Sequence, residues 1–261
     1  MLRTTDQRWS DAMRENKLRT LWASGRAATN VWCHIPSSYA TEIIAHQGWD
    51  SLTVDTQHGP IGYTEMVAML TAIATTPAVP LVRVSWNNPG EVMRAADAGA
   101  MGIICPTVNS KAECEQFVGA LRYAPLGYRS LGPNRARFLG DDYTVKSNET
   151  ILAIAQIETA SGLENVEAIA SVKGLDMLYI GPSDLGLSIG REGRMDQTDA
   201  VVVAAIDRIL KTAKEARIKA GIFCVDPTYS RAMLAKGFDL VTVLSDTTLL
   251  SAGSTVRKQF V

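Results

Sequence analysis

Eight short apolar runs, each followed by an amphipathic segment, are the feature that most constrains the fold of this sequence. The runs are rich in Val, Ile and Leu, and several of the segments between them end at a Gly of the kind found after helix C-termini. Parallel strands need helical crossovers, so this alternation predicts a parallel sheet. The expected strands are 30–34, 51–55, 81–85, 102–106, 152–158, 177–181, 220–225 and 240–245.

Eight such units in 261 residues predict a single (β/α)₈ TIM barrel of the α/β class, closed by the eighth strand. A doubly wound open sheet is the alternative, and it is disfavoured because no GxGxxG follows the first strand. We expect an N-terminal helical segment (1–26) with a helix over 6–21 across the bottom of the barrel. The barrel itself would span 27–246, and a C-terminal segment (247–261) would form a helix over 247–259.

Composition narrows the class of partner. The chain is 46% hydrophobic and 20% charged, and its net charge of -1 argues against nucleic acid or an anionic membrane as the main partner. It has no apolar run of about 18 residues and its N-terminus is polar, so we predict a cytoplasmic protein without a membrane span or secretion signal. The cysteines lack paired spacing and are expected to be reduced and structural; they are Cys33, Cys105, Cys114 and Cys224.

Polar side chains gather where the expected strands end, which is where active sites of this fold lie. They are Asp55, His58, Arg83, Gln156, Glu158, Ser183 and Asp184. Each has a structural explanation when taken alone: Arg83 could pair with a buried acid, and His58 could cap a helix. Their shared position at one rim predicts a functional site.

Two of these residues are carboxylates at the ends of successive strands, Glu158 and Asp184. A buried carboxylate is costly unless it is compensated, so a converging pair indicates a hard divalent cation with oxygen ligands. The alternative is that each acid pairs with an Arg or caps the next helix.

Two absences exclude other chemistries. Every Lys falls in a helix, a loop or a strand entrance, so a Schiff-base lysine is not expected. No Gly-rich phosphate loop is present, so neither a nucleotide cofactor nor a phosphate ester is expected.

Two long connections predict lids or binding surfaces. They are 123–149, with Arg129, Arg135 and Arg137, and 185–196, with Arg191 and Arg194. Their cationic side chains favour an anionic substrate, and a carboxylate fits better than a phosphate. The alternative is a solvated or subunit-contacting loop.

The blocks VDTQHGP, LVRVSW, RAADAGAMGIICP, AQIET and GPSDLGLSIG resemble the HpcH/HpaI family of metal-dependent pyruvate aldolases, within the citrate lyase beta-like superfamily. The resemblance runs over residues 29–246. It implies reversible cleavage of a 4-hydroxy-2-oxo acid, of the heptanedioate or 2-keto-3-deoxy sugar acid type, into pyruvate and an aldehyde. It also implies a divalent cation (Mg²⁺, Mn²⁺ or Co²⁺) and a homo-oligomer, specifically a hexamer with exchanged C-terminal helices.

The resemblance also assigns roles to residues. Glu158 and Asp184 would hold the metal, and His58 would be the base. Arg83 would stabilise the enolate, and Asp97 would raise the basicity of His58, although a structural salt bridge is an alternative for Asp97 because it lies in a helix. Gln156 and Ser183, with Asp184 and Arg83, would contact the 2-oxo acid, and Asp55 would support them.

One departure is Gln57, where many relatives have an acid before the histidine. Two other functions stay open from the sequence: an acyl-CoA lyase of the citrate or malyl-CoA lyase type, and a non-catalytic 2-oxo acid binding protein.

Overall fold

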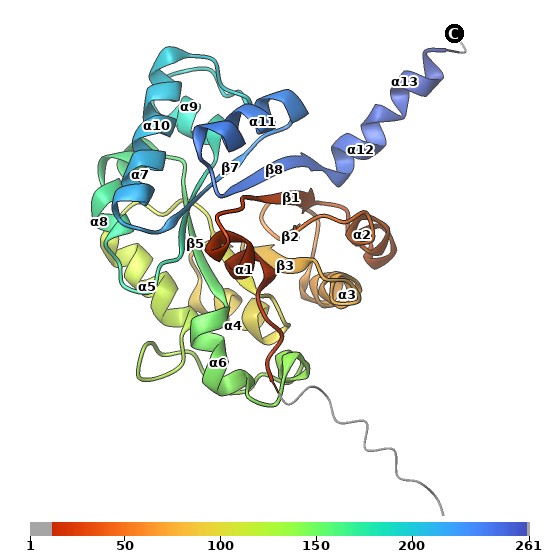
Figure 1. Cartoon of the computed structure of the whole chain (residues 1–261), viewed down its shortest axis with the longest axis vertical. Coiled ribbons are helices and arrows are strands. Elements are labelled where there is room, and N and C mark those ends of the chain that lie inside the picture. Colours follow the sequence, from red (N-terminus) through yellow and green to blue (C-terminus); the bar gives the residue numbers. More distant parts are fainter. Residues whose placement is uncertain (1–11, 260–261) are drawn as a thin grey trace, which may run out of the picture.

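The computed structural model describes residues 12–259, and its centre is a closed barrel of eight parallel strands in sequence order (Figure 1). The strands are β1 (Ala28–Cys33), β2 (Ser51–Asp55), β3 (Val79–Arg83), β4 (Gly102–Cys105), β5 (Leu152–Ile157), β6 (Met177–Ile180), β7 (Lys219–Phe223) and β8 (Leu240–Ser245). The predicted TIM barrel is confirmed, and the expected strands are all present with ends that differ by at most two residues. We call the side of the barrel that carries the C-terminal ends of the strands the upper end, and the opposite side the lower end.

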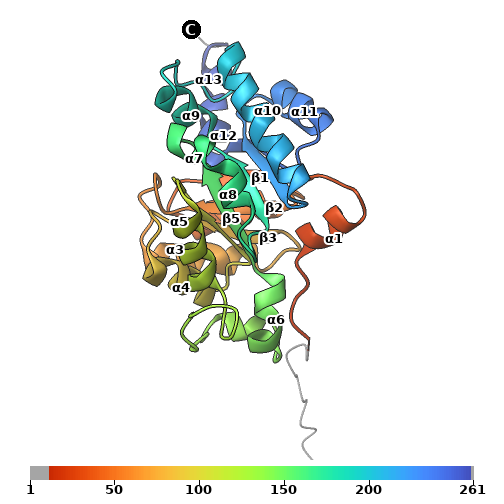
Figure 2. The ribbon, with the colours of Figure 1, turned by 90° about the vertical axis from the view of Figure 1, so that its left-hand side faces the viewer.

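Helices surround the barrel, and side-chain caps fix where several of them begin (Figures 1 and 2). Asn88 and Asp226 each accept hydrogen bonds from two backbone N–H groups of the following turn, and a proline occupies the next position. The helices are α1 (Lys17–Ala23), α2 (Ser38–Ala45), α3 (Tyr63–Ile73), α4 (Pro89–Asp97), α5 (Lys111–Leu121), the 3₁₀ turn η1 (Ala136–Leu139), α6 (Tyr143–Thr150), α7 (Ala160–Glu164), α8 (Val166–Ala170), α9 (Pro182–Ser188), α10 (Ala200–Glu215), α11 (Pro227–Lys236), α12 (Asp246–Ala252) and α13 (Ser254–Arg257).

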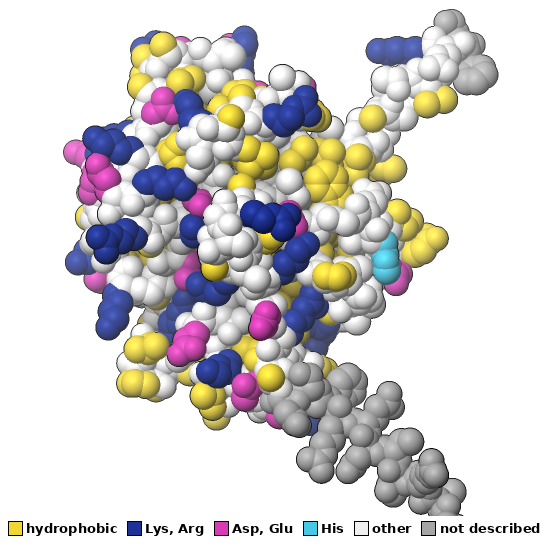
Figure 3. All heavy atoms as spheres, in the orientation of Figure 1, with side chains coloured by type: hydrophobic (Ala, Val, Ile, Leu, Met, Phe, Trp, Pro, Cys, Tyr) yellow, Lys and Arg dark blue, Asp and Glu magenta, His cyan; other side chains and the backbone are white. Residues whose placement is uncertain are grey.

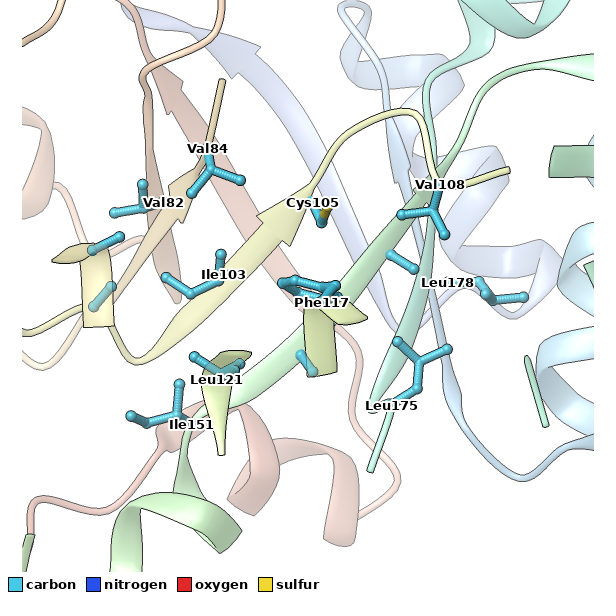
Figure 4. Close-up of a cluster of buried hydrophobic side chains, with 14 of the residues drawn as sticks. Val82, Val84, Ile103, Cys105, Val108, Phe117, Leu121, Ile151, Leu175 and Leu178 are labelled. Carbon is cyan, nitrogen blue, oxygen red and sulfur yellow. The ribbon is translucent and has the colours of Figure 1, made fainter. Parts of the chain in front are cut away.

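Each strand is buried on both faces because successive side chains alternate between two cores. In β4, Ile103 belongs to the layer between sheet and helices, whereas Ile104 belongs to the barrel interior. Figure 4 shows the outer layer, where Phe117 of α5 lies close to Ile103 and Cys105 of β4, and Leu121 lies close to Ile151, directly before β5. This double burial explains why the strands read as continuous apolar runs.

The lower end is closed by α1, as expected, but the helix is shorter than predicted. Residues 6–11 of the expected helix lie outside the described residues, and from Ala12 onward the helical turns begin only at Lys17, after the cap Asn16. Asn16 also donates to the carbonyl oxygens of Met101 and Thr150, and Trp22 donates to that of Asp239. At the other terminus the expected helix is split into α12 and α13, which project away from the barrel in Figure 1.

The segment 123–149 does not cover the upper end, so the expected lid is wrong for this segment, while a binding surface and a subunit contact stay predictions. It links α5 to β5, and a connection from a helix to the next strand of a βα barrel lies at the lower end. Arg122, at its start, donates to the carbonyl oxygen of Ile151, and Figure 2 shows α6 at the opposite end of the molecule from α9. Two of its arginines make contacts within the protein: Arg129 pairs with Asp97, and Arg135 donates to the carbonyl oxygen of Ala98.

The surface carries no dominant charge on the face shown in Figure 3, where positive and negative side chains are interspersed. Among residues 12–259 no helix has the length and apolar character needed to cross a membrane. The four cysteines are all buried and unpaired, as expected.

Candidate active site

Two adjoining hollows open at the upper end of the barrel and share His58 and Asp184. The first has a volume of about 280 Å³ and is lined by residues in or just after every strand except β4. The second, of about 420 Å³, also includes Gln57, Thr107 and Glu158. Together they bring most of the predicted site residues to one place: His58, Arg83, Gln156, Ser183 and Asp184 line the first hollow, and Glu158 lines the second.

Arg83 is held by Asp55 on the neighbouring strand. The two residues are Cα partners in the register of β2 and β3, and Arg83 donates from Nε (2.9 Å) and Nη2 (2.6 Å) to the two carboxylate oxygens. Burial by itself would raise the pKa of Asp55, but hydrogen bonds from His34 and Arg83 outweigh it and hold that pKa well below its usual range. Arg83 thus pairs with a buried acid, which was its structural explanation from the sequence, and it also lines the first hollow.

Aromatic rings form an apolar wall around Arg83. Its guanidinium carbon lies 5.0 Å from the centre of the Trp32 ring. Trp32 stacks on Tyr179 at 5.7 Å and meets the edge of Phe223 at 5.2 Å. These rings keep water away from one side of the guanidinium, which strengthens its electrostatic interactions.

Glu158 lies just beyond β5 and is held by two neighbours. Thr107 donates to Oε1 from its backbone N–H (2.8 Å) and its hydroxyl (2.9 Å), while Gln156 donates from Nε2 to Oε2. Burial raises the pKa of Glu158 and the charge of Asp184 raises it further, against the opposing hydrogen bonds. Two mutually repelling carboxylates at one hollow are what a cation would compensate.

Glycine is required at position 181, directly before the helix that carries Asp184. A Cβ there would collide with Oε2 of Glu158 and would lie 2.9 Å from Nε2 of Gln156. The missing side chain lets the end of β6 approach the carboxylate closely. Thr107 has φ of +53°, in the left-handed region that is costly for a Thr, and this conformation directs both of its donors at Glu158.

The oxygen donors of this site suit a hard cation. The side chains of Glu158 and Asp184 meet at the second hollow, and Oε1 of Gln156 is buried without a hydrogen-bond partner. Within the described range 12–259 no group of three or more His, Cys, Asp or Glu side chains could hold a metal ion, so an ion bound here would keep positions for water or substrate. None of the described residues lining the two hollows is a lysine.

Two residues of the site were missed from the sequence, His34 and Asp246. His34 lines the first hollow, with Nε2 3.2 Å from Asp55 Oδ2 and Nδ1 3.6 Å from Asp246 Oδ1. Both follow apolar runs, at the end of the expected strand 30–34 and directly after 240–245. The rule that selected Asp55 and Asp184 would have selected them too.

Asp97 does not join the site within the chain. It ends α4 and is paired with the buried guanidinium of Arg129, which also donates to the hydroxyl of Tyr143. The end of α4 precedes β4 and therefore lies at the lower end, whereas His58 lies at the upper end. The prediction that Asp97 raises the basicity of His58 is wrong for a single chain, and the alternative, a structural ion pair, is what the structure shows.

The segment 185–196 does lie at the upper end, but neither Arg191 nor Arg194 lines the two hollows. Arg194 pairs with Glu192 (2.8 Å) and Arg191 lies 3.9 Å from Asp199. Met195 contributes to the wall of the first hollow and accepts a weak hydrogen bond from Ser183. The arginines of this segment form local ion pairs, and their role toward an anionic substrate stays a prediction.

Known proteins are similar to this chain in sequence and in fold. The model of the family described as HpcH/HpaI aldolase/citrate lyase matches residues 29–252. A hydroxypyruvate/pyruvate aldolase of Rhizorhabdus wittichii is 40% identical over 240 residues, 92% of this chain and 96% of that protein. A 4-hydroxy-2-oxo-heptane-1,7-dioate aldolase of Escherichia coli is 33% identical over 241 residues, 91% of each chain.

A solved structure of an HpcH/HpaI aldolase/citrate lyase family protein from Burkholderia cenocepacia has a TM-score of 0.87 and 31% identity, covering 94% of this chain and 98% of that chain. These matches confirm the predicted carbon–carbon lyase activity and the predicted function as a pyruvate aldolase. By its sequence and its fold, the chain belongs to the HpcH/HpaI aldolase/citrate lyase family.

Proposed function

We propose that the protein reversibly cleaves a 4-hydroxy-2-oxo acid into pyruvate and an aldehyde, with a divalent cation held by Glu158 and Asp184. One observation carries this proposal: two adjoining hollows bring the carboxylates of Glu158 and Asp184 together with Arg83 and His58. Burial raises the pKa of Glu158 and the charge of Asp184 adds to this rise, so a cation bound between the two carboxylates would stabilise their charged forms.

The cation would be Mg²⁺, Mn²⁺ or Co²⁺, because all its protein ligands are hard oxygens. When bound, it would polarise the keto group of the 2-oxo acid and offset the negative charge that develops there. Gln156 and Thr107 keep Glu158 in place for this ligation.

Arg83 stabilises the enolate oxygen as the C3–C4 bond breaks. Asp55 occupies Nε and Nη2, so Nη1 stays available on the side of the hollow. A guanidinium already fixed in position needs no reorganisation when charge develops, which favours the transition state over the ground state. Gln156 and Ser183, on the same wall, are suited to hydrogen-bond the carboxylate of the 2-oxo acid.

His58 takes the proton of the 4-hydroxyl, directly or through water. It is the residue that both hollows share with Asp184, so it lies between the expected pyruvate position and the remaining space for the aldehyde. Imidazole is the side chain whose ordinary pKa is closest to neutrality, which suits a base that must also return the proton in the addition direction.

The test is metal dependence with matched variants. Glu158→Gln and Asp184→Asn should abolish pyruvate release, and calorimetry should show that Mn²⁺ affinity is lost with them. Glu167→Gln, which removes an exposed acid paired with Arg208, is the control and should behave as wild type. Full activity in excess EDTA would overturn the proposal, as would a covalent adduct trapped by borohydride in the presence of pyruvate.

A further inference from the structure

His34 lies between two carboxylates that belong to different parts of the barrel. It directly follows β1, its Nε2 is 3.2 Å from Oδ2 of Asp55 on β2, and its Nδ1 is 3.6 Å from Oδ1 of Asp246, the first residue of α12. Its backbone N–H also donates to Asp246, at 2.9 Å to Oδ2. The ring is therefore positioned from three elements.

Both neighbours of the ring are ionised acceptors. Asp55 is fully buried and receives the fork of Arg83, and Asp246 also accepts the backbone N–H groups of Ile35 and Thr247. A neutral imidazole carries one N–H, so one of its nitrogens would direct a lone pair at a carboxylate. Only the doubly protonated ring presents an N–H to both carboxylates; at 3.6 Å, Nδ1 faces Asp246 as an ion pair and makes no hydrogen bond with it.

We propose that His34 is a positioning residue: as an imidazolium it ties the Asp55–Arg83 pair to Asp246 and so fixes the direction from which Arg83 enters the hollow. The inference rests on the proposed function in one respect, the role of Arg83 at the enolate. The structural part, a charged ring linking two carboxylates, is independent of it.

The surroundings of the ring support the charged form. Burial by itself would lower the pKa of His34, but the adjacent carboxylates of Asp246 and Asp55 raise it to about 9. Two acids face the ring directly, Asp246 of α12 and Asp55 of β2. Arg83 of β3 is paired with the same Asp55, and His58 lines the same hollow as His34.

The consequence for Arg83 follows from the sharing of Asp55. Its Oδ2 receives both Arg83 Nη2 at 2.6 Å and His34 Nε2 at 3.2 Å, so the plane of the carboxylate is fixed from two sides. Without His34, Oδ2 of Asp55 keeps only Arg83, while Oδ1 still accepts from Arg83 and from the backbone N–H of Gln57 at 3.0 Å. The carboxylate can then turn about Oδ1 and shift the guanidinium with it. A displaced guanidinium still binds an anion, but it no longer meets the enolate oxygen as it forms.

The first experiment reads the ring directly. Imidazole ¹⁵N spectra of the whole protein should show one of the three histidines of the sequence doubly protonated at pH 8, and that signal should be absent from His34→Gln. His46→Gln and His58→Gln assign the other two signals. A neutral His34 at pH 8 would overturn the inference whatever the enzyme's activity.

The second experiment reads the effect on Arg83. His34→Gln should lower kcat for pyruvate release roughly 10- to 100-fold, with KM changed much less, because alignment is lost while charge is kept. Asp246→Asn should give the same pattern, and the double variant should be no worse than the poorer single variant, since both remove one linkage. His46→Gln, at the exposed end of α2, is the matched control.

The outcomes separate this inference from the proposed function. If the chelator and Glu158→Gln abolish activity but His34→Gln matches His46→Gln in kcat, the positioning role is wrong and the metal-dependent reaction stands. If the ¹⁵N signal is found and the chelator has no effect, the imidazolium linkage stands and the proposed function is wrong. Purely additive losses in the double variant would also contradict a single linkage.

Discussion

The barrel has a buried Asp–Arg network at each end, and the two differ in what their arginines have left to donate. At the lower end Arg122 donates to Asp176 (2.9 Å) and to the backbone carbonyl oxygens of Ile151 (2.7 Å) and Gly174 (2.8 Å). At the upper end Arg83 gives two donors to Asp55, and no further hydrogen bond from it is recorded among residues 12–259. Their side chains are almost equally buried, 4% and 9% exposed.

Burial and ion pairing therefore do not distinguish Arg83, which we propose acts on the substrate, from the structural Arg122. What distinguishes them is a spare donor that faces a hollow. Arg122 closes the lower end by satisfying backbone carbonyl groups, which would otherwise be costly to bury. Arg83 is equally well anchored, but its anchor leaves part of the guanidinium for a substrate.

The largest effect should come from removing the base beside the upper network. His58→Ala should slow aldol cleavage roughly 10²- to 10⁴-fold, the usual loss for a general base. Oxaloacetate has no 4-hydroxyl, yet its decarboxylation yields the same pyruvate enolate, so this reaction should be largely spared. Both rates are measured on the variant at one fixed Mn²⁺ concentration. Equal losses would mean that His58 organises the substrate and is not the base.

The next largest effect tests the comparison itself, with one conservative change at each end. Arg83→Lys should lower kcat about 10²- to 10³-fold with little loss of pyruvate affinity, because a compact ammonium cannot supply the same donors. Arg122→Lys should leave kcat near wild type and lower the free energy of unfolding by about 1–3 kcal/mol, since buried carbonyl groups lose their donors. Steady-state kinetics and urea denaturation separate the two. If Arg83→Lys lowered the free energy of unfolding as Arg122→Lys does and left kcat unchanged, the two arginines would not differ in role.

A smaller effect is expected at Thr107, which stabilises the candidate metal ligand without being one. Thr107→Val removes the hydroxyl donor to Glu158 but keeps the backbone donor, and should weaken Mn²⁺ binding about 10- to 100-fold. Calorimetric titration measures this, and activity should recover at high metal concentration. Thr150→Val, which removes only a local hydroxyl bond within α6 at the lower end, is the control. Unchanged metal affinity in Thr107→Val would show that the backbone N–H alone fixes Glu158.

The smallest effect concerns pH. The pKa of His34 is raised to about 9 by Asp246 and Asp55 against the effect of burial. Because the folded value lies above the ordinary value of about 6.5, its contribution to folding is fully present below about pH 6.5 and is lost as pH rises through about 9. The free energy of unfolding of wild type minus that of His34→Gln should therefore shrink between these values. A difference that stays constant would place the ring in its neutral form.

The fold and most of the rim could be predicted from the sequence because both depend on local patterns. Apolar runs identify the strands, and a polar residue directly after a run, such as Asp55 or Asp184, is placed at the upper end by topology alone. His34 obeys the same rule but was counted as the last residue of a strand. Its importance depends on Asp246, which is distant in sequence and adjacent only once β8 closes on β1.

Two expectations are not met within the single chain, the lid in 123–149 and Asp97 beside His58, because length and resemblance do not say at which end a residue lies. The segment 123–149 is long and cationic, but it leads from a helix to a strand, and that order places it at the lower end. Asp97 lies at the end of α4 and finds Arg129 there, a partner that no local pattern connects with it. Partners from distant segments are set by three-dimensional packing.

The pairing of Asp55 with Arg83 follows from the register of β2 and β3. This register limits how the active site can change during evolution. In a closed barrel, slipping β2 against β3 by one residue would turn each side chain of the strand to its other face and would demand a compensating slip at another seam. The separation of these groups can therefore change only in discrete steps, whereas the loops above them vary continuously. Descendants of this chain should diverge in the aldehydes they accept well before they diverge in the bond they break.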